Sequence, residues 1–112
     1  MSEHFRRLEK MYLSAPVNQP LDLEIEIGDR KTTIKQGIKV EHCHAAGALH
    51  GSYYFKCLDD ACYFAAAGIN LEYFVLTVDF HLRLIRPVTP DLEYVLAKGM
   101  VVSSTTRLII CE

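Results

Sequence analysis

The sequence lacks several features that would point to whole classes of protein. No apolar run approaches the roughly 18 residues needed to cross a bilayer, and residues 6–10 lack the apolar stretch of a secretory signal. Lys and Arg total 12 against 14 Asp and Glu, without the basic patch and interleaved aromatic residues typical of nucleic-acid binding. We therefore expect a cytoplasmic protein with no nucleic-acid partner and no membrane partner.

The spacing of the cysteines argues against disulfides. The sequence has four of them, at Cys43, Cys57, Cys62 and Cys111. They include no Cys-x-x-Cys pair, and two of them fall in a predicted helix among apolar neighbours, which is typical of buried free thiols. We therefore expect reduced, buried cysteines.

A cluster of His and Cys at residues 42–44 raises two further hypotheses. His42 and His44 alternate as two zinc ligands on a strand do, but no second pair of ligands follows at a matching spacing. Cys43 is a candidate nucleophile with a histidine base, yet no third group to orient that base is evident. The residues therefore favour neither a metal site nor a cysteine nucleophile.

The length of 112 residues suits one domain over residues 1–112, with a single core and no separate cofactor domain. Half of the residues are hydrophobic, and the mean hydropathy of +0.10 is apolar for a soluble monomer of this size. We therefore expect part of the surface to be buried against another subunit.

Hydrophobic periodicity predicts an α+β domain. In chain order we expect a helix at 1–14, strands at 21–27 and 31–40, a loop at 41–50, a helix at 51–67, and strands at 73–85, 92–102 and 105–111. The first helix has Phe5, Leu8 and Tyr12 at helical spacing and is expected to lie as a flap over the domain. One antiparallel sheet then wraps around the helix at 51–67.

Residues 107–112 resemble the middle of a hairpin more than its end. This pattern predicts that the final strand is missing, so that one edge of the sheet is open or covered by a partner.

Two adjacent carboxylates on the predicted central helix have different environments. At about 100° per residue, Asp60 points away from the apolar stripe formed by Phe55, Leu58, Cys62 and Ala65, and it can pair with Lys56 in solvent. Asp59 lies on the shoulder of that stripe. A carboxylate at the edge of a core costs free energy unless it is hydrogen-bonded or functional, so Asp59 is the candidate functional carboxylate.

His50 and Gly51 stand where the loop enters this helix. The first N–H groups of a helix have no partner inside it and favour an oxygen that develops negative charge. Gly51 has no side chain, so a substrate can approach its backbone closely. The pair is therefore a candidate carbonyl-binding site.

These residues resemble a known family. Residues 44–52 read HAAGALHGS, Asp59 follows nine residues after His50, and a later segment reads Thr77-Val-Asp79. The pattern is similar to hotdog-fold acyl-CoA thioesterases of the phenylacetic-acid-degradation type, which carry Asn-x-x-Gly-x-x-His-Gly-Gly, an aspartate at that distance and a Ser/Thr-x-Asp strand. The resemblance spans about residues 21–110. His44 replaces the Asn, and Ser52 replaces the second glycine.

The resemblance implies a role for each matching residue. Asp59 matches the catalytic carboxylate, as general base or nucleophile, and Gly51 matches the backbone donor to the thioester carbonyl. His50 matches the histidine that shapes the loop, and Thr77 matches the hydroxyl that orients water. His44 is the second expected donor to the carbonyl.

The resemblance also implies a hotdog fold, an acyl-CoA substrate, no cofactor and no metal. In the family the two halves of each site come from different subunits, which implies a homodimer or a dimer of dimers. A non-catalytic acyl-CoA-binding module is the alternative function, and a hydratase or dehydratase of the same fold is a third.

Overall fold

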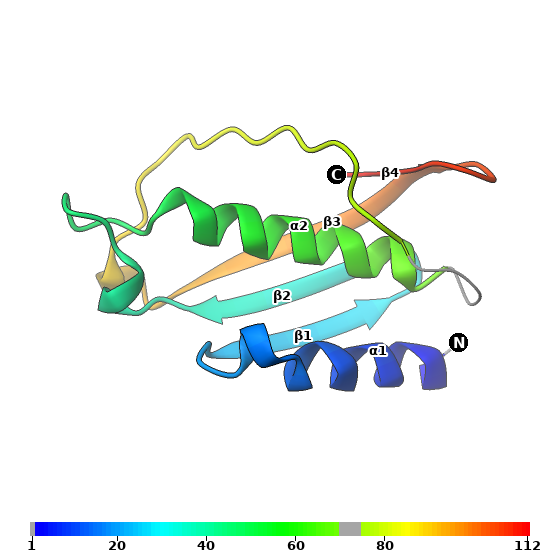
Figure 1. The fold of residues 1–112 in the computed structure, drawn as a ribbon, viewed down its shortest axis with the longest axis horizontal. Helices are drawn as coiled ribbons and strands as arrows, with labels where there is room; N and C mark the ends of the chain where they lie inside the picture. Colours follow the sequence, from blue (N-terminus) through cyan, green and yellow to red (C-terminus); the bar gives the residue numbers. More distant parts are fainter. Residues whose placement is uncertain (1, 70–74) are drawn as a thin grey trace.

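The computed structural model describes residues 2–69 and 75–112 (Figure 1). Its elements in chain order are α1 (Ser2–Ser14), a 3₁₀ turn (Pro16–Asn18), β1 (Leu23–Gly28), β2 (Lys31–Gly37), a 3₁₀ turn (Val40–His42), α2 (Gly51–Ala67), a 3₁₀ turn (Pro90–Leu92), β3 (Tyr94–Ser104) and β4 (Ile109–Cys111). Both helices have the predicted bounds to within a residue, and the expected α+β class is confirmed.

The four strands form one antiparallel sheet in the order β1-β2-β3-β4. Within the sheet, Ile25 is opposite Ile34, and Ile34 is opposite Ala97. Helix α2 contacts all four strands, so the sheet curves around one long helix (Figure 1). This is the hotdog architecture that the family resemblance implies.

Close packing of α2 on the sheet depends on small residues at one contact. A Cβ added to Gly99 of β3 would lie 2.5 Å from the backbone of Ala61 on α2, so the helix and the strand meet without side chains between them. Ala61 and Ala97 are fully buried beside this contact. The contact sets the height of α2 above the sheet.

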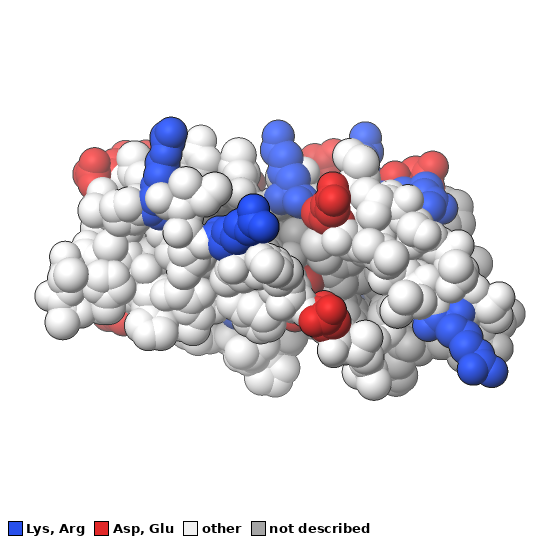
Figure 2. Space-filling view, turned by 90° about the horizontal axis from the view of Figure 1, so that it is seen from above, with Lys and Arg blue, Asp and Glu red and all other residues white. Residues whose placement is uncertain are grey.

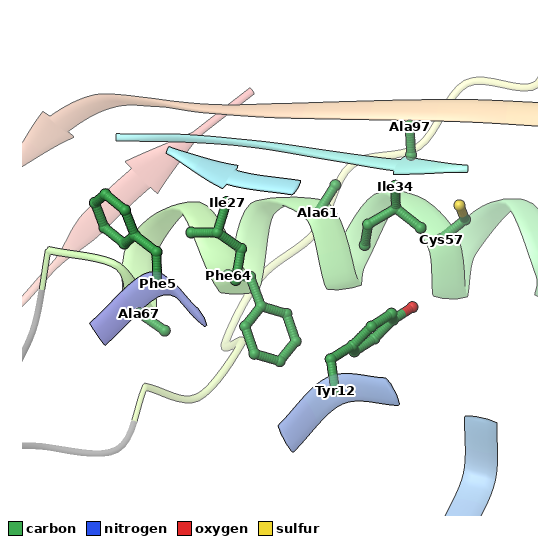
Figure 3. Close-up of a cluster of buried hydrophobic side chains, with 9 residues drawn as sticks. All are labelled: Phe5, Tyr12, Ile27, Ile34, Cys57, Ala61, Phe64, Ala67 and Ala97. Carbon is green, nitrogen blue, oxygen red and sulfur yellow. The ribbon is translucent and has the colours of Figure 1, made fainter. Parts of the chain in front are cut away.

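The core lies between α1, α2 and the sheet (Figure 3). It contains Phe5, Tyr12, Ile27, Ile34, Cys57, Ala61, Phe64, Ala67 and Ala97. The buried stripe of α2 therefore runs through Cys57, Ala61 and Phe64, whereas Phe55 is 42% exposed. The predicted stripe was centred on the wrong face, because α1 covers a side of α2 that local periodicity assigned to solvent.

Helix α1 is part of the core and is not a flap. Phe5 and Tyr12 are buried, and two side chains of α1 bond the backbone of Ile27 on β1. Arg6 donates to its carbonyl at 2.8 Å, and Glu9 accepts from its N–H at 2.8 Å. Because an edge strand carries unpaired backbone groups, these bonds make α1 the cover of the β1 edge.

Two predictions for the strands were wrong in detail. Of the predicted strand 73–85, residues 75–85 carry no strand pairing and run alongside α2 as an extended segment (Figure 1), whereas Tyr73 and Phe74 lie outside the described residues. Strand β2 ends at Gly37, so Val40 is exposed on a 3₁₀ turn beyond the strand. The buried face of β2 carries Thr32 and Gln36 as well as Ile34. Alternating polarity alone does not reveal buried polar side chains.

Within the described residues, the structure contains no helix that combines the length and the apolar character needed to cross a membrane.

Candidate active site

Asp59 and Thr77 form the central contact of the candidate site. Asp59 lies half-buried on α2, and Thr77 lies on the extended segment that runs alongside the helix. The Thr77 hydroxyl donates a hydrogen bond of 2.8 Å to Asp59 Oδ1. The structure therefore brings together two predicted site residues that are 18 positions apart in the chain.

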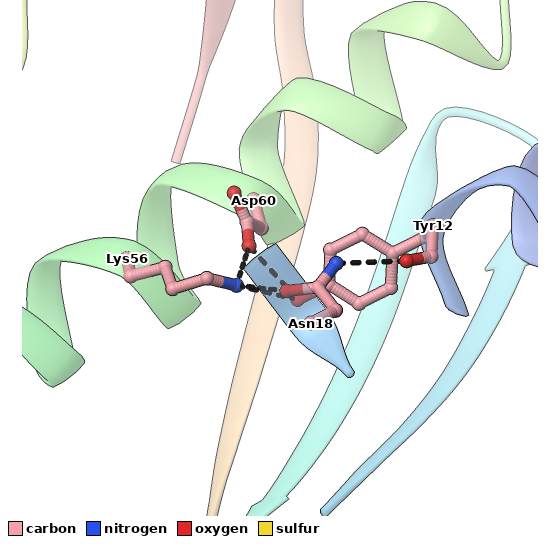
Figure 4. A network of polar contacts seen from close by, with 4 residues as sticks. All are labelled: Tyr12, Asn18, Lys56 and Asp60. Atoms are coloured by element: carbon pink, nitrogen blue, oxygen red, sulfur yellow. Dashed lines mark hydrogen bonds and ion pairs between the residues drawn. The ribbon is translucent and has the colours of Figure 1, made fainter. Parts of the chain in front are cut away.

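The neighbouring carboxylate, Asp60, has a different environment (Figure 4). Its Oδ2 accepts hydrogen bonds from Lys56 Nζ at 2.7 Å and from the Tyr12 hydroxyl at 2.8 Å. Lys56 also donates to Asn18 Oδ1 at 2.6 Å. The predicted Lys56–Asp60 pair is present, but it is about one-fifth exposed and packed beneath α1. Asp60 thus joins the two helices and is not a plain surface charge.

The second half of the candidate site is the loop that enters α2. His50 is the N-cap residue, and its Nδ1 accepts from the Ser52 N–H at 3.1 Å. Gly51 is the first residue of the helix, where the N–H has no partner inside the helix. A Cβ added to Gly51 would lie 3.2 Å from Leu84 Cδ1, so Leu84 packs over this backbone.

His44 shapes a tight turn before the helix. Its Nδ1 accepts from the Ala46 N–H at 3.0 Å, and its carbonyl accepts from the Gly47 N–H at 2.9 Å. Gly47 has a φ of +86°, a conformation that favours glycine. The exposed His44 ring therefore has its Nδ1 engaged within the turn, which leaves its other nitrogen for a ligand.

His42 belongs to the packing of this loop. Its ring stacks on Tyr53 with centroids 4.2 Å apart, whereas the neighbouring Cys43 thiol points to the carbonyl of Lys39 at 3.7 Å. In the part of the chain that the structure describes, no three His, Cys, Asp or Glu side chains gather as a metal site would require.

The two halves of the candidate site are apart within one chain. Gly51 and Asp59 lie eight residues apart on one straight helix, which corresponds to ~12 Å along its axis. A thioester carbonyl bound at the Gly51 N–H is thus out of reach of Asp59 in the same chain.

A cavity of about 550 Å³ adjoins the Asp59 half of the site. Its walls are α2, residues 75–82 with Thr77, and strand β4. Leu58 and Tyr63 of α2 line it together with Ile109 of β4. Strand β4 was not predicted as a wall of this site, because no local pattern indicates which strand faces this part of α2.

Burial changes the acidity of the thiols near the site. Burial raises the pKa of Cys57 to about 11, with a further contribution from the Asp60 charge. Burial also raises the pKa of Cys62 to about 11, with contributions from Cys111 and from Asp59. These thiols stay protonated at neutral pH, which does not suit a thiolate nucleophile. All four cysteines are free as expected, but of the four only Cys57 is fully buried.

Solved structures share this architecture at low sequence identity. A variant of the phenylacetic acid degradation protein PaaI from Thermus thermophilus is 16% identical, with 88% of each chain covered and a TM-score of 0.72. A phenylacetic acid degradation-related protein from Ralstonia eutropha JMP134 is 14% identical, with 96% of this chain and 93% of the other covered and a TM-score of 0.75.

Sequence comparison gives a family for this fold. A comparison with curated proteins found no match. The model of the thioesterase superfamily matches residues 46–112, a stretch that contains α2, Asp59, Thr77 and both later strands. The resemblance to hotdog-fold thioesterases of the phenylacetic-acid-degradation type is thereby confirmed, and the chain belongs to the thioesterase superfamily.

Proposed function

We propose that the protein hydrolyses an acyl-CoA thioester to a free acid and coenzyme A, with Asp59 as general base or nucleophile. The observation that carries the proposal is the 2.8 Å hydrogen bond from Thr77 to Asp59 Oδ1, on the central helix of a thioesterase-superfamily fold. This bond orients the carboxylate, so that Oδ2 can accept a proton from a bound water. The adjacent cavity suits an acyl group.

In the proposed reaction, the thioester oxygen accepts a hydrogen bond from the Gly51 N–H, and His44 is the second donor. Water transfers a proton to Asp59 as its oxygen adds to the carbonyl carbon. The C–S bond then breaks, and the proton passes from Asp59 to the coenzyme A sulfur. Because a thioester is already activated, positioning and electrostatic stabilisation can supply the catalysis. If Asp59 is instead the nucleophile, water hydrolyses an acyl anhydride.

A second copy of the chain would complete the site. Because Gly51 and Asp59 are ~12 Å apart along α2, the two halves can meet on one thioester only if they come from different subunits. The segment that runs alongside α2 exposes Leu76 at 80%, Val78 at 81% and Ile85 at 85%. Figure 2 shows that this face is largely uncharged. Such an apolar face supports a homodimer or a dimer of dimers.

Two adjacent carboxylates provide the test. We would follow thiol release from short, medium, long and aryl acyl-CoAs with the wild-type protein and with Asp59→Asn and Asp60→Asn. Asp59→Asn should lose at least 100-fold in kcat and keep its Tm. Asp60→Asn should lower the Tm, because it weakens the contacts with Tyr12 and Lys56, and should keep kcat per folded molecule.

The alternative function has a distinct result. A non-catalytic acyl-CoA-binding module would gain thermal stability from an acyl-CoA and release no thiol. Undiminished turnover in Asp59→Asn would contradict the proposed role of Asp59.

A further inference from the structure

Two cysteines, one on the central helix and one on the last strand, line the same cavity. Cys62 lies on α2, one turn after Asp59, and Cys111 lies on β4. Helix α2 and strand β4 are in contact, and both cysteines line the 550 Å³ cavity. Each thiol also affects the pKa of the other. Both side chains are partly exposed and unoxidised. A small reagent that enters the cavity can therefore meet both thiols.

We propose that Cys62 and Cys111 form a modification site at which a small disulfide, such as oxidised glutathione, converts the two thiols into an intramolecular disulfide. This reaction does not rest on the proposed hydrolysis of thioesters, although it takes place in the cavity that is proposed to hold the acyl group. It assigns a chemistry to the cavity that does not depend on Asp59.

The reaction balances as two thiol–disulfide exchanges. The first thiolate attacks one sulfur of oxidised glutathione, and one glutathione leaves as a thiolate that takes up a proton. The second cysteine then attacks the mixed disulfide and releases the second glutathione. Overall, the two protein thiols lose two electrons and two protons, and one oxidised glutathione becomes two reduced molecules.

The surroundings of the two thiols suggest which of them attacks first. Burial raises the pKa of Cys111 above its ordinary value, although the positive charge of Arg30 and the Cys62 thiol oppose part of this rise. Burial also raises the pKa of Cys62, and the charges of Cys111 and Asp59 raise it further. Both thiols are therefore protonated at neutral pH, and the exchange proceeds through the thiolate fraction that a higher pH supplies. Because the charge of Arg30 favours the thiolate of Cys111, this cysteine attacks first and Cys62 completes the disulfide.

The other two cysteines have no such partner among the described residues. Cys57 is buried in the core beneath α1, with 2% of its surface exposed. The Cys43 thiol contacts the carbonyl of Lys39. Cys57 and Cys43 are therefore the two thiols that should stay free when the protein is oxidised.

A disulfide at this position would tether β4 to α2. It would close a loop of about 50 residues, which reduces the entropy of the unfolded chain. It would also fix the wall of the cavity that β4 provides, next to Thr77. We therefore expect oxidation to stabilise the fold and to hold the β4 wall of the cavity in one position relative to α2.

The test is to incubate the folded protein with oxidised glutathione at pH 8 and to measure thiols, mass and Tm. The free thiols should fall from four to two, the mass should fall by about 2 Da, and the Tm should rise by ~5 °C or more. Dithiothreitol should reverse all three changes. None of these readouts uses thioester hydrolysis, so they remain informative if the proposed function fails.

Variants identify the pair. Cys111→Ser should stop at a mixed disulfide of Cys62 or not react, with no rise in Tm, whereas Cys43→Ser should behave as the wild type does. The proposal would be overturned by four free thiols in the treated protein, by a disulfide that persists in Cys111→Ser, or by a disulfide between two copies on a non-reducing gel.

Discussion

The hydroxyl of Tyr12 donates a hydrogen bond of 2.8 Å to Asp60 Oδ2, which joins α1 to α2 across 48 positions of the chain. Lys56 bonds the same oxygen at 2.7 Å, and its Nζ lies 5.2 Å from the centroid of the Tyr12 ring. Asn18 completes the group by donating to the Tyr12 carbonyl at 2.7 Å. This polar group lies at the border of the core, so each partner depends on the others for its hydrogen bonds.

Tyr12→Phe should therefore destabilise the fold. The change keeps the ring, with its edge contact to Phe64, and removes only the hydroxyl. We expect a loss of about 1–2 kcal/mol in the free energy of unfolding, measured by urea titration. Tyr94→Phe is the control, because that side chain is 43% exposed and should change stability by less than about 0.5 kcal/mol. Equal effects of the two substitutions would contradict a structural role for the Tyr12–Asp60 bond.

Stability should decline at alkaline pH through groups that the fold keeps neutral. Burial raises the pKa of Cys57 from 9.0 to about 11, and burial together with Asp60 raises the pKa of Tyr12 above its ordinary range. The unfolded chain releases these protons at lower pH than the folded chain does, so rising pH favours unfolding. The contribution of Cys57 should be complete below about pH 8 and lost between about pH 9 and 11.

Urea midpoints measured from pH 7 to pH 11 test this dependence. Cys57→Ala should be less stable than the wild type at pH 7, because it leaves a cavity in the core, and its decline above pH 9 should be shallower. Parallel declines in the two proteins would show that Cys57 does not contribute.

Gly99→Ala should strongly destabilise the sheet-to-helix contact. The added methyl group would lie 2.5 Å from the backbone of Ala61, so α2 would have to move away from β3. We expect a loss of about 2–3 kcal/mol, measured by thermal unfolding. Gly28→Ala is the matched control, because its new methyl group would meet only the flexible Lys31 side chain at 3.2 Å. A Gly99→Ala protein as stable as Gly28→Ala would contradict the contact.

Local patterns predict the parts of this fold that depend on local sequence. The apolar spacing and Gly68 place the ends of α2 correctly, since its C-cap N–H bonds the carbonyl of Phe64. Helical geometry also separates Asp59 from Asp60. The contact of Tyr12 with Asp60 was not predicted, because nothing near either residue indicates that α1 packs there.

In the candidate site, too, local sequence predicts some residues but not the contacts between distant segments. His50 at the start of α2 was found from the sequence, although it caps the helix with its own side chain. Thr77 entered through the family resemblance, since a threonine is ordinary on any extended segment. Its bond to Asp59 depends on how residues 75–82 lie alongside α2, and the spacing of residues within either segment does not encode this contact.

The proposed role of the Gly51 N–H has a selective test. Gly51 is the first residue of α2. The residue before it, His50, has φ −64° and ψ 141°, a backbone conformation that is compatible with a following proline. Proline is favoured at this helix position, so Gly51→Pro should remove the N–H and keep the helix. We expect a loss of about 100-fold or more in kcat.

Gly51→Ala is the matched control. It keeps the N–H and adds a methyl group that meets only the Leu84 side chain, at 3.2 Å. The comparison is made on acyl-CoA turnover, with circular dichroism to verify the fold of both variants. Similar kcat values for the proline and alanine variants would exclude the N–H as a donor to the thioester.

Mixing two inactive variants tests whether each site draws on two subunits. Asp59→Asn damages one half of the proposed site, and Gly51→Pro damages the other. In a mixed dimer, one site receives both changes and the other receives neither, so each mixed dimer keeps one intact site. Random pairing makes about half of the dimers mixed, and the mixture should regain about one quarter of the wild-type activity.

The experiment requires subunits that exchange, so the two variants would be co-expressed with different tags and the doubly tagged dimer purified. That dimer should have about half the wild-type turnover. If Gly51 and Asp59 acted within one chain, every site in the mixed dimer would carry one damaged half, and no activity would return. The ~12 Å between these residues along α2 favours the first result, because no single thioester spans that distance between its carbonyl oxygen and an attacking water.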